Sequence, residues 1–319
     1  ATGIAGIDAA GDRVLINSGH TESATAISYI CPGTATNPCQ LLSVTPTGTS
    51  GISSLTAGAT FTGSSTGLTF NGSFYASGLS LVASGGSITL ASAAAANQVW
   101  ENCTFSITNA TAGTRFAIGC TAANAGSNVR LINPVFQTGA TGQRIAYCGD
   151  LRIDGGSWSA SGTDPTAVFI PYGADGAGRG GGLTVQGFNF ANLPSTVNLV
   201  GLSNGGCQAL FRDVTLPASW SGAPISSSDV EDGQRVEVWN YVISGGARHR
   251  FWVRDTRCDL TPETTIVRSG GGADAAGAYA VKMVTTSACS YPVAVAASMV
   301  FGKNNTTTGS SITVSMEII

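Results

Sequence analysis

The feature that most constrains the fold is a short motif that recurs along the middle of the chain. In each copy a short apolar strand meets Asn, Asp or Gly, and a large apolar residue follows three positions later, as in Val99-Trp-Glu-Asn102-Cys-Thr-Phe105. Successive copies are 22 to 32 residues apart. The central residues of the seven copies are Asn71, Asn102, Asn133, Gly155, Gly187, Asp213 and Asn240.

The motif predicts a tight bend between two short strands, because Asn, Asp and Gly tolerate left-handed backbone. Alternate residues before the bend, such as Leu183 and Val185, should point inward. The spacing is typical of one coil of a three-sided β-solenoid, in which each coil buries its apolar face on its neighbours. The sequence therefore predicts an all-β, right-handed parallel β-helix over residues 61–248. An antiparallel β-sandwich is the alternative, because Asn and Gly turns also separate its strands.

The two flanking regions lack the motif. Residues 1–60 are rich in Thr, Ser and Gly, and we interpret them as a capping or anchoring region because the ends of a solenoid must be covered. Residues 249–319 contain five short segments of apolar–polar alternation, separated by Gly, Ser and Asn. This pattern predicts a small antiparallel β-sandwich. No run of eighteen apolar residues occurs, so no membrane-spanning helix is expected.

The charge pattern argues against nucleic acid as a partner. Charged residues make up 10% of the chain, compared with roughly 25% in an ordinary soluble domain. The net charge is −3 and the basic residues are scattered. The densest positive patch is Arg248, His249, Arg250 and Arg254. We predict that it contacts an acidic neighbouring subunit, with internal pairing to nearby aspartates as the alternative.

The cysteines suggest disulfides rather than a metal site. None of the eight forms a CxxC pair, and two histidines do not suffice for a zinc cage. Cys31 and Cys39 bracket a short loop, and Cys258 and Cys289 lie in the C-terminal region. Each pair is a candidate disulfide in an oxidising setting; the alternative is that they are small buried apolar residues. No metal or cofactor is predicted.

Catalytic carboxylates are the main alternative to a purely structural role. Glycoside hydrolysis needs two carboxylates at a defined separation, and the best candidates are Asp150, Asp154, Asp175 and Asp213. All four fall at bends or in turn-like sequences, where Asp side chains commonly bond to local backbone. The acidic group Asp229, Glu231 and Asp232 is interpreted as a solvated loop rather than a calcium site. We therefore predict that the protein is not an enzyme.

The C-terminal region resembles that of a known family. Residues 281–286 read Val-Lys-Met-Val-Thr-Thr, and residues 305–311 read Asn-Thr-Thr-Thr-Gly-Ser-Ser before a final alternating strand. Both stretches, in this order, resemble the small terminal β-domain of bacteriophage virion proteins of the β-helix type. The resemblance covers residues 249–319 in sequence and the rest only as architecture. The many cysteines depart from the family pattern.

The resemblance implies a structural protein on the virion surface. Its expected role is capsid decoration or cementing of the head, with phage capsid subunits and further copies of itself as partners, and a homotrimer as the expected assembly. The alternative is a tail fibre or tailspike component that binds, or cleaves, host surface polysaccharide. Exposed tryptophans would then stack on sugars; the five candidates are Trp100, Trp158, Trp220, Trp239 and Trp252. A cellular surface adhesin is a third interpretation.

Overall fold

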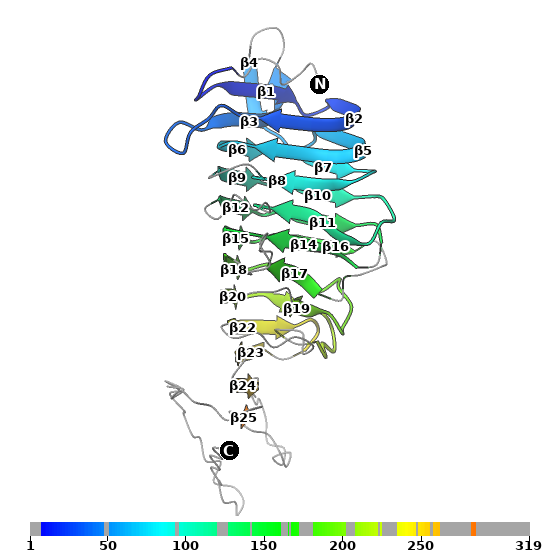
Figure 1. Ribbon diagram of the computed structural model, residues 1–319, viewed down its shortest axis with the longest axis vertical. Coiled ribbons are helices and arrows are strands. Elements are labelled where there is room, and N and C mark those ends of the chain that lie inside the picture. The colour runs from blue at the N-terminus through cyan, green and yellow to red at the C-terminus, as the bar shows by residue number, and fades with distance from the viewer. Residues whose placement is uncertain are drawn as a thin grey trace, which may run out of the picture.

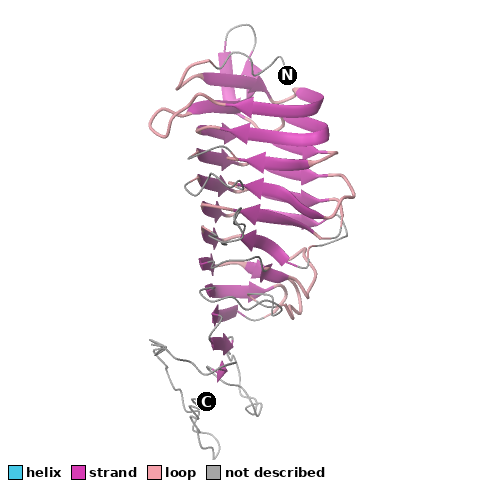
Figure 2. Ribbon diagram, in the orientation of Figure 1, coloured by secondary structure: helices cyan, strands magenta, loops and turns pink. Residues whose placement is uncertain are grey.

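The computed structural model consists of strands and contains no helix in the residues that it describes (Figures 1 and 2). The described residues are 8–47, 51–92, 96–119, 127–140, 142–160, 165, 167–171, 181–201, 208–222, 224, 235–246, 248–255, 258–261 and 282–284. The strands form two large sheets in which most neighbours pair in parallel. The all-β prediction is thus confirmed. Figure 1 shows the strands stacked along the long axis, with β1 near one end.

The first sheet grows by one parallel strand each time the chain returns to it. Its parallel strands, in order, are β1 (Arg13–Asn17), β3 (Cys39–Thr47), β6 (Phe74–Ser77), β9 (Asn97–Glu101), β12 (Asn128–Ile132), β15 (Asp150–Asp154), β18 (Gly182–Gln186), β20 (Gln208–Arg212) and β22 (Arg235–Ile243). We call the run from β6 to β22 the first ladder. Two short strands pair beside it, β4 (Gly51–Leu55) with β3 and β21 (Thr215–Leu216) with β22.

The second sheet contains two parallel ladders joined by one long strand, β5 (Thr60–Asn71). The beginning of β5 pairs with β7 and its end pairs with β8. The second ladder comprises β7 (Ser80–Ala83), β10 (Thr104–Ile107), β13 (Val135–Thr138) and β16 (Ser157–Ala160). The third comprises β8 (Ser87–Leu90), β11 (Gly113–Ile118), β14 (Gln143–Tyr147), β17 (Ala167–Pro171) and β19 (Asn198–Val200). From β6 to β17 the chain visits the three ladders in turn four times, and we call each such passage a circuit.

A column of left-handed residues follows the first ladder. Glu101, Ile132 and Asp154 end paired strands in register, and the residue after each has positive φ. The backbone N–H of each column member before Asn240 donates to the carbonyl of the strand end in the next circuit, as from Asn102 to Ile132 at 2.8 Å. This bend column comprises Gly78, Asn102, Asn133, Gly155, Gly187, Asp213 and Asn240.

Asn71 is not a member of this column, in contrast to the expectation from the motif. It is the last residue of β5, and the positive φ lies at the next residue, Gly72 (+88°). Phe70 pairs with Leu90 at the end of the third ladder, so Asn71 lies at a different corner of the circuit. The member of the bend column in that circuit is Gly78, which follows Ser77, the partner of Glu101.

The core lies between the ladders and is filled with apolar side chains. On the first ladder one inward column is fully buried from end to end; it consists of Ala76, Trp100, Leu131, Ile153, Val185, Phe211 and Val238. On the second ladder, the ring of Phe136 stacks between those of Phe105 and Trp158 at centroid distances of 5.4 and 5.6 Å. Strand spacing in a parallel sheet, about 4.8 Å, brings equivalent rings on neighbouring strands into contact.

The flanking regions extend the sheets at both ends. In the predicted N-terminal region, β1 and β3 belong to the first sheet, while β2 (Thr21–Ile30) pairs along β5. Parallel pairing thus continues into residues 1–60, and their anchoring role stays a prediction. After β22 the pairing becomes antiparallel, through β23 (Arg248–Asp255), β24 (Cys258–Thr261) and β25 (Lys282–Val284). Most of the predicted sandwich lies outside the described residues. In the described part of the chain, no helix is long and apolar enough to cross a membrane.

Candidate functional site

The outward side of the first ladder gathers the most varied polar side chains of the described surface. Because side chains alternate across a strand, the residues between the buried positions form parallel outward columns. The middle column runs Tyr75, Val99, Arg130, Arg152, Thr184, Leu210 and Glu237. The column beside it runs Ser77, Glu101, Ile132, Asp154, Gln186, Arg212 and Trp239. We call this surface the outer face.

One charged cluster lies in the middle of the outer face. Nε of Arg130 is 2.7 Å from one carboxylate oxygen of Asp154, and Nε of Arg152 is 2.9 Å from the other. The arginine side chains are 50% and 52% exposed, whereas that of Asp154 is 18% exposed. Pairs as exposed as these contribute only about 0.2–1 kcal/mol each. The cluster therefore orders the surface more than it stabilises the fold.

Tyr75 and Glu101 form a second contact on the outer face, one strand apart. The hydroxyl of Tyr75 donates a hydrogen bond to Oε2 of Glu101. Burial, together with this hydrogen bond, raises the pKa of the Tyr75 hydroxyl. Both groups thus have a local role in fixing the side chains of β6 and β9.

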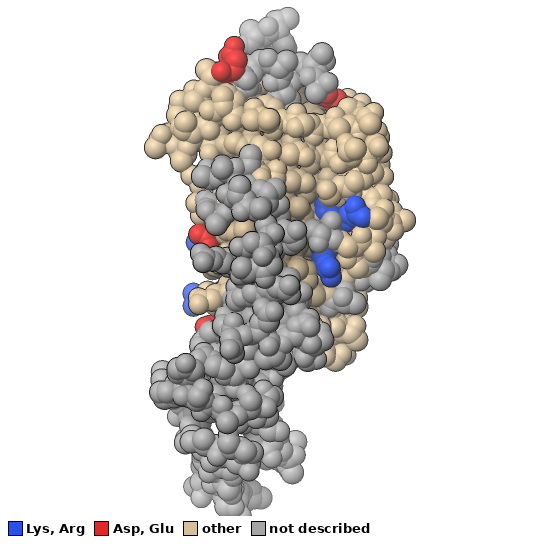
Figure 3. All heavy atoms as spheres, in the orientation of Figure 1, with Lys and Arg blue, Asp and Glu red and all other residues tan. Residues whose placement is uncertain are grey.

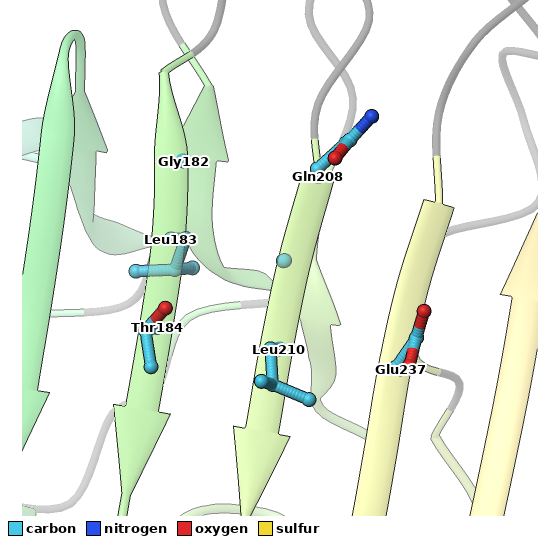
Figure 4. A pocket seen from close by; sticks show the side chains of 7 residues that line it. Gly182, Leu183, Thr184, Gln208, Leu210 and Glu237 are labelled. Carbon is cyan, nitrogen blue, oxygen red and sulfur yellow. The ribbon is translucent and has the colours of Figure 1, made fainter.

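A shallow hollow of about 250 Å³ lies on the outer face across β18, β20 and β22 (Figure 4). Its walls are formed by Gly182, Leu183, Thr184, Gln208, Ala209, Leu210 and Glu237. Beside the hollow, Trp239 is 38% exposed, and its Nε1–H donates to Oε2 of Glu237 at 2.9 Å. The hollow is thus lined by a carboxylate, an amide and a hydroxyl, and Glu237 links it to the indole of Trp239.

The three candidate aspartates that the structure describes, Asp150, Asp154 and Asp213, do not come together as a catalytic pair. Asp150 and Asp154 lie on the same side of β15, four residues apart, which separates their Cα atoms by about 13 Å. Glycosidase carboxylates are about 5 to 9.5 Å apart. Oδ1 of Asp150 instead accepts the N–H of Gly182 at 3.1 Å. Asp213 belongs to the bend column and accepts a hydrogen bond from Asn240. Asp175 lies outside the described residues.

Glu101 and Asp154 are the nearest approach to a pair of acids in register. They share an outward column with Ile132 between them, so their Cα atoms are about 9.6 Å apart. Tyr75 already contacts Glu101, and two guanidinium groups contact both oxygens of Asp154. Both carboxylates therefore serve local contacts, and the arrangement gives no argument for hydrolysis.

Metal-binding clusters are missing from the described part of the chain. No group of three or more His, Cys, Asp or Glu side chains is placed to hold an ion there. The acidic sequence at 229–232 lies outside the described residues. Figure 3 shows that charged side chains on the visible face are few and separated by neutral surface.

The cysteine and arginine predictions are answered only in part. Cys31, Cys39 and Cys103 are buried free thiols, and Cys148 is also buried. Cys289 and the side chain of Cys258 lie outside the described part. The backbone of β23 carries Arg248, His249, Arg250 and Arg254 alongside β22, but their side chains are outside the described part. Their contact with a neighbouring subunit stays a prediction.

The sequence did not single out the polar residues of the outer face apart from Asp154 and Trp239. Among the tryptophans, Trp100 and Trp158 are fully buried, Trp220 is 9% exposed and Trp239 is 38% exposed. The signal that separates them is strand parity: Trp239 is one residue from the inward Val238, whereas Trp100 occupies the inward column itself. Once the register is known, that parity identifies Trp239, Glu237 and Thr184 as outward.

Comparison with known proteins returned no match. No family model matches the chain, and neither does any curated protein or any solved structure.

Proposed function

We propose that the protein is a non-enzymatic structural component of a bacteriophage virion surface, built as a right-handed parallel β-helix with a C-terminal β-sandwich. We place it on the phage head, as a decoration or cement protein that bridges capsid subunits. Many weak copies bound at symmetric sites then add up through avidity. A homotrimer suits this role, because cyclic symmetry matches threefold sites on a capsid.

The observation that carries the proposal is the uninterrupted parallel first ladder with its fully buried inward column. Seven successive strands keep one register from Ala76 to Val238. Each internal strand is hydrogen-bonded on both sides and packed above and below, so local opening must break contacts with two neighbours. Such a stack is suited to bearing load. The candidate aspartates meanwhile serve ion pairs and backbone hydrogen bonds.

The virion assignment is supported by the resemblance of residues 249–319 described above. The test is gold labelling of intact phage particles with an antibody raised against the full chain, followed by electron microscopy. Label spread over the heads is the expected result. Label confined to the tail would overturn the decoration role, and absence of label from purified infectious particles would overturn the virion role.

The second candidate function is binding of host surface polysaccharide by a tail component. The observation that favours it is the hollow beside Trp239, where a partly exposed indole is held by Glu237. Aromatic faces that lie next to hydrogen-bonding groups are suited to amphipathic ligands such as sugars.

A glycan array probed with the full chain distinguishes the two functions. If this candidate holds, Trp239→Ala lowers binding at least tenfold. Arg130→Ala, on the same face but outside the hollow, leaves binding unchanged. Wild-type protein that binds no glycan on the array would eliminate this candidate.

A further inference from the structure

Two buried cysteines, Cys31 and Cys39, both contact the backbone of residues 71–73. Cys31 follows β2 and Cys39 begins β3, with loop 32–38 between them. The backbone N–H of Cys31 donates to the carbonyl of Asn71 at 2.9 Å, and that of Cys39 donates to the carbonyl of Ser73 at 3.2 Å. The thiol of Cys31 reaches the same Ser73 carbonyl at 3.4 Å. Both residues are thus seated over one short stretch of backbone.

The loop between the two cysteines folds back tightly. A Cβ atom placed on Gly33 would lie 2.7 Å from the backbone nitrogen of Cys39 and 3.1 Å from Sγ of Cys31. Sγ of Cys31 and the backbone nitrogen of Cys39 thus face the same Ser73 carbonyl, and the two residues are 4% and 0% exposed. The thiol of Cys103, elsewhere in the stack, reaches backbone carbonyls of Ala76 and Glu101.

We propose that Cys31 and Cys39 are a disulfide site that closes loop 32–38 when the protein folds in, or enters, an oxidising medium. The two thiols lose two electrons and two protons as the S–S bond forms. A small disulfide such as oxidised glutathione accepts both and leaves as two molecules of its thiol. The two buried thiols are the reduced form of the site.

The disulfide would secure one end of the stack. Asn37, in the loop, donates from Nδ2 to the carbonyl of Ala10 at 2.8 Å, and the thiol of Cys39 lies 3.5 Å from the carbonyl of Ala9. The loop therefore holds the residues before β1 against the rest of the protein. β1 and β2 each pair with one strand among the described residues. A covalent closure here strengthens the circuit with the fewest neighbours.

The timing of oxidation follows from burial. Desolvation, followed by the contacts with Cys31, raises the pKa of the Cys39 thiol to about 11. The thiolate is the reactive species in disulfide exchange. We expect slow oxidation of the folded protein at neutral pH and faster oxidation during folding or at alkaline pH.

The test uses cleavage after glutamate, because residues 23–101 then form one fragment that contains Cys31 and Cys39 and no other cysteine. The full chain is refolded with oxidised and reduced glutathione, alkylated without reduction under denaturing conditions, cleaved and weighed. We expect this fragment to carry no alkyl group. Its mass should be lower than that of the reduced, unalkylated fragment by two hydrogen atoms. A fragment alkylated at both cysteines, or joined to another fragment, would overturn the proposal.

A second measurement distinguishes the Cys31–Cys39 disulfide from other effects of cysteine oxidation. The oxidised wild type should melt several degrees higher than the same protein treated with reductant, because closing the loop restricts the unfolded chain. Cys39→Ser should depend less on reductant than the wild type, whereas Cys103→Ser should retain the full dependence. Equal reductant dependence in the wild type and in Cys39→Ser would count against the site. Neither readout depends on where the protein lies on a virion.

Discussion

Asn133 and Gly155 are successive members of the bend column, and they show how one residue constrains the next. Both have left-handed backbone, with φ of 49° and 70°. Nδ2 of Asn133 donates to Oδ1 of Asn102 at 3.3 Å. Its Oδ1 lies 2.3 Å from the position that a Cβ on Gly155 would take. The side chain of Asn133 in this orientation therefore leaves no room for a Cβ atom at position 155.

Gly155→Ala should destabilise the protein by about 2 kcal/mol or more, through left-handed strain together with this clash. In an Asn133→Gly background, the same substitution should cost less, because the obstructing amide is gone. Urea unfolding of the four proteins in this double-mutant cycle measures the coupling. Equal costs in the two backgrounds would show that the clash is relieved elsewhere.

A buried thiol should make stability depend on alkaline pH. Burial raises the pKa of Cys103 from an ordinary value of 9.0 to about 12. Between these values the unfolded chain loses the proton and the folded chain keeps it, so the free energy of unfolding falls as pH rises. The expected slope from this group is up to ~1.4 kcal/mol per pH unit.

Urea unfolding at several pH values from 8 to 11 compares the wild type with Cys103→Ala. The variant should lose less stability over this range, whatever its stability at pH 8. If the free energies of unfolding of the two proteins fell equally with pH, Cys103 would either remain protonated in both states or be solvated in the folded state.

Residue chemistry made most of the bend column predictable, and the exception is instructive. Asn102, Asn133, Gly155, Gly187, Asp213 and Asn240 all have positive φ. Asn71 has the same sequence context but closes the third ladder, where Ala91 and Gly119 carry the positive φ in later circuits. The short motif predicts that the chain bends. Only the strand register shows whether the bend follows the first or the third ladder.

At the scale of the element, β5 explains why the second and third ladders form one sheet. It is twelve residues long and pairs with β7 through Thr60–Gly63 and with β8 through Gly67–Phe70. At the change of partner, Gly67 has φ of +87°, and a Cβ there would lie 2.0 Å from the carbonyl oxygen of Ser87. The absence of a side chain lets β5 turn closely against β8.

Gly67→Ala should be among the most damaging single substitutions in the protein. Its matched control is Gly113→Ala, because Gly113 has φ of +95° but no atom within 4 Å of the place that a Cβ would occupy. The control carries left-handed strain alone, about 1–3 kcal/mol, whereas Gly67→Ala adds displacement of backbone. We expect a further loss of about 2 kcal/mol, measured by thermal or urea unfolding. A Gly67→Ala protein as stable as the control would refute the close approach.

The outer face was less predictable than the bends because its identity depends on register. A shift of one residue exchanges inward and outward side chains along a whole strand. The repeat located the strand ends well enough to place Leu183 and Val185 inward, and both are buried. The hydrogen bond of Trp239 to Glu237 and the hollow beside it need neighbouring strands in register, which no local pattern specifies.

At the scale of the whole molecule, contacts run mainly between neighbouring circuits. In such a stack stability is approximately a sum of repeat and interface contributions. Internal strands such as β9, β12 and β15 pair on both sides, whereas β1 and β2 each pair on one side among the described residues. The end circuit should therefore open more often than the middle.

Hydrogen–deuterium exchange followed by mass spectrometry tests this gradient. Amides of β9, β12 and β15 should exchange more slowly than those of β1 and β2. Exchange at one uniform rate along the described ladders would show instead that the molecule opens only as a whole.

The bend column also makes length an independent property of this protein. From Asn102 to Asn133 the chain completes one circuit and returns to the same backbone conformation, one strand further along the first ladder. Removing residues 102–132 would join equivalent points and shorten the protein by about 4.8 Å while preserving the faces on either side. Gain or loss of such units would therefore change the length of the protein while leaving both of its ends unchanged.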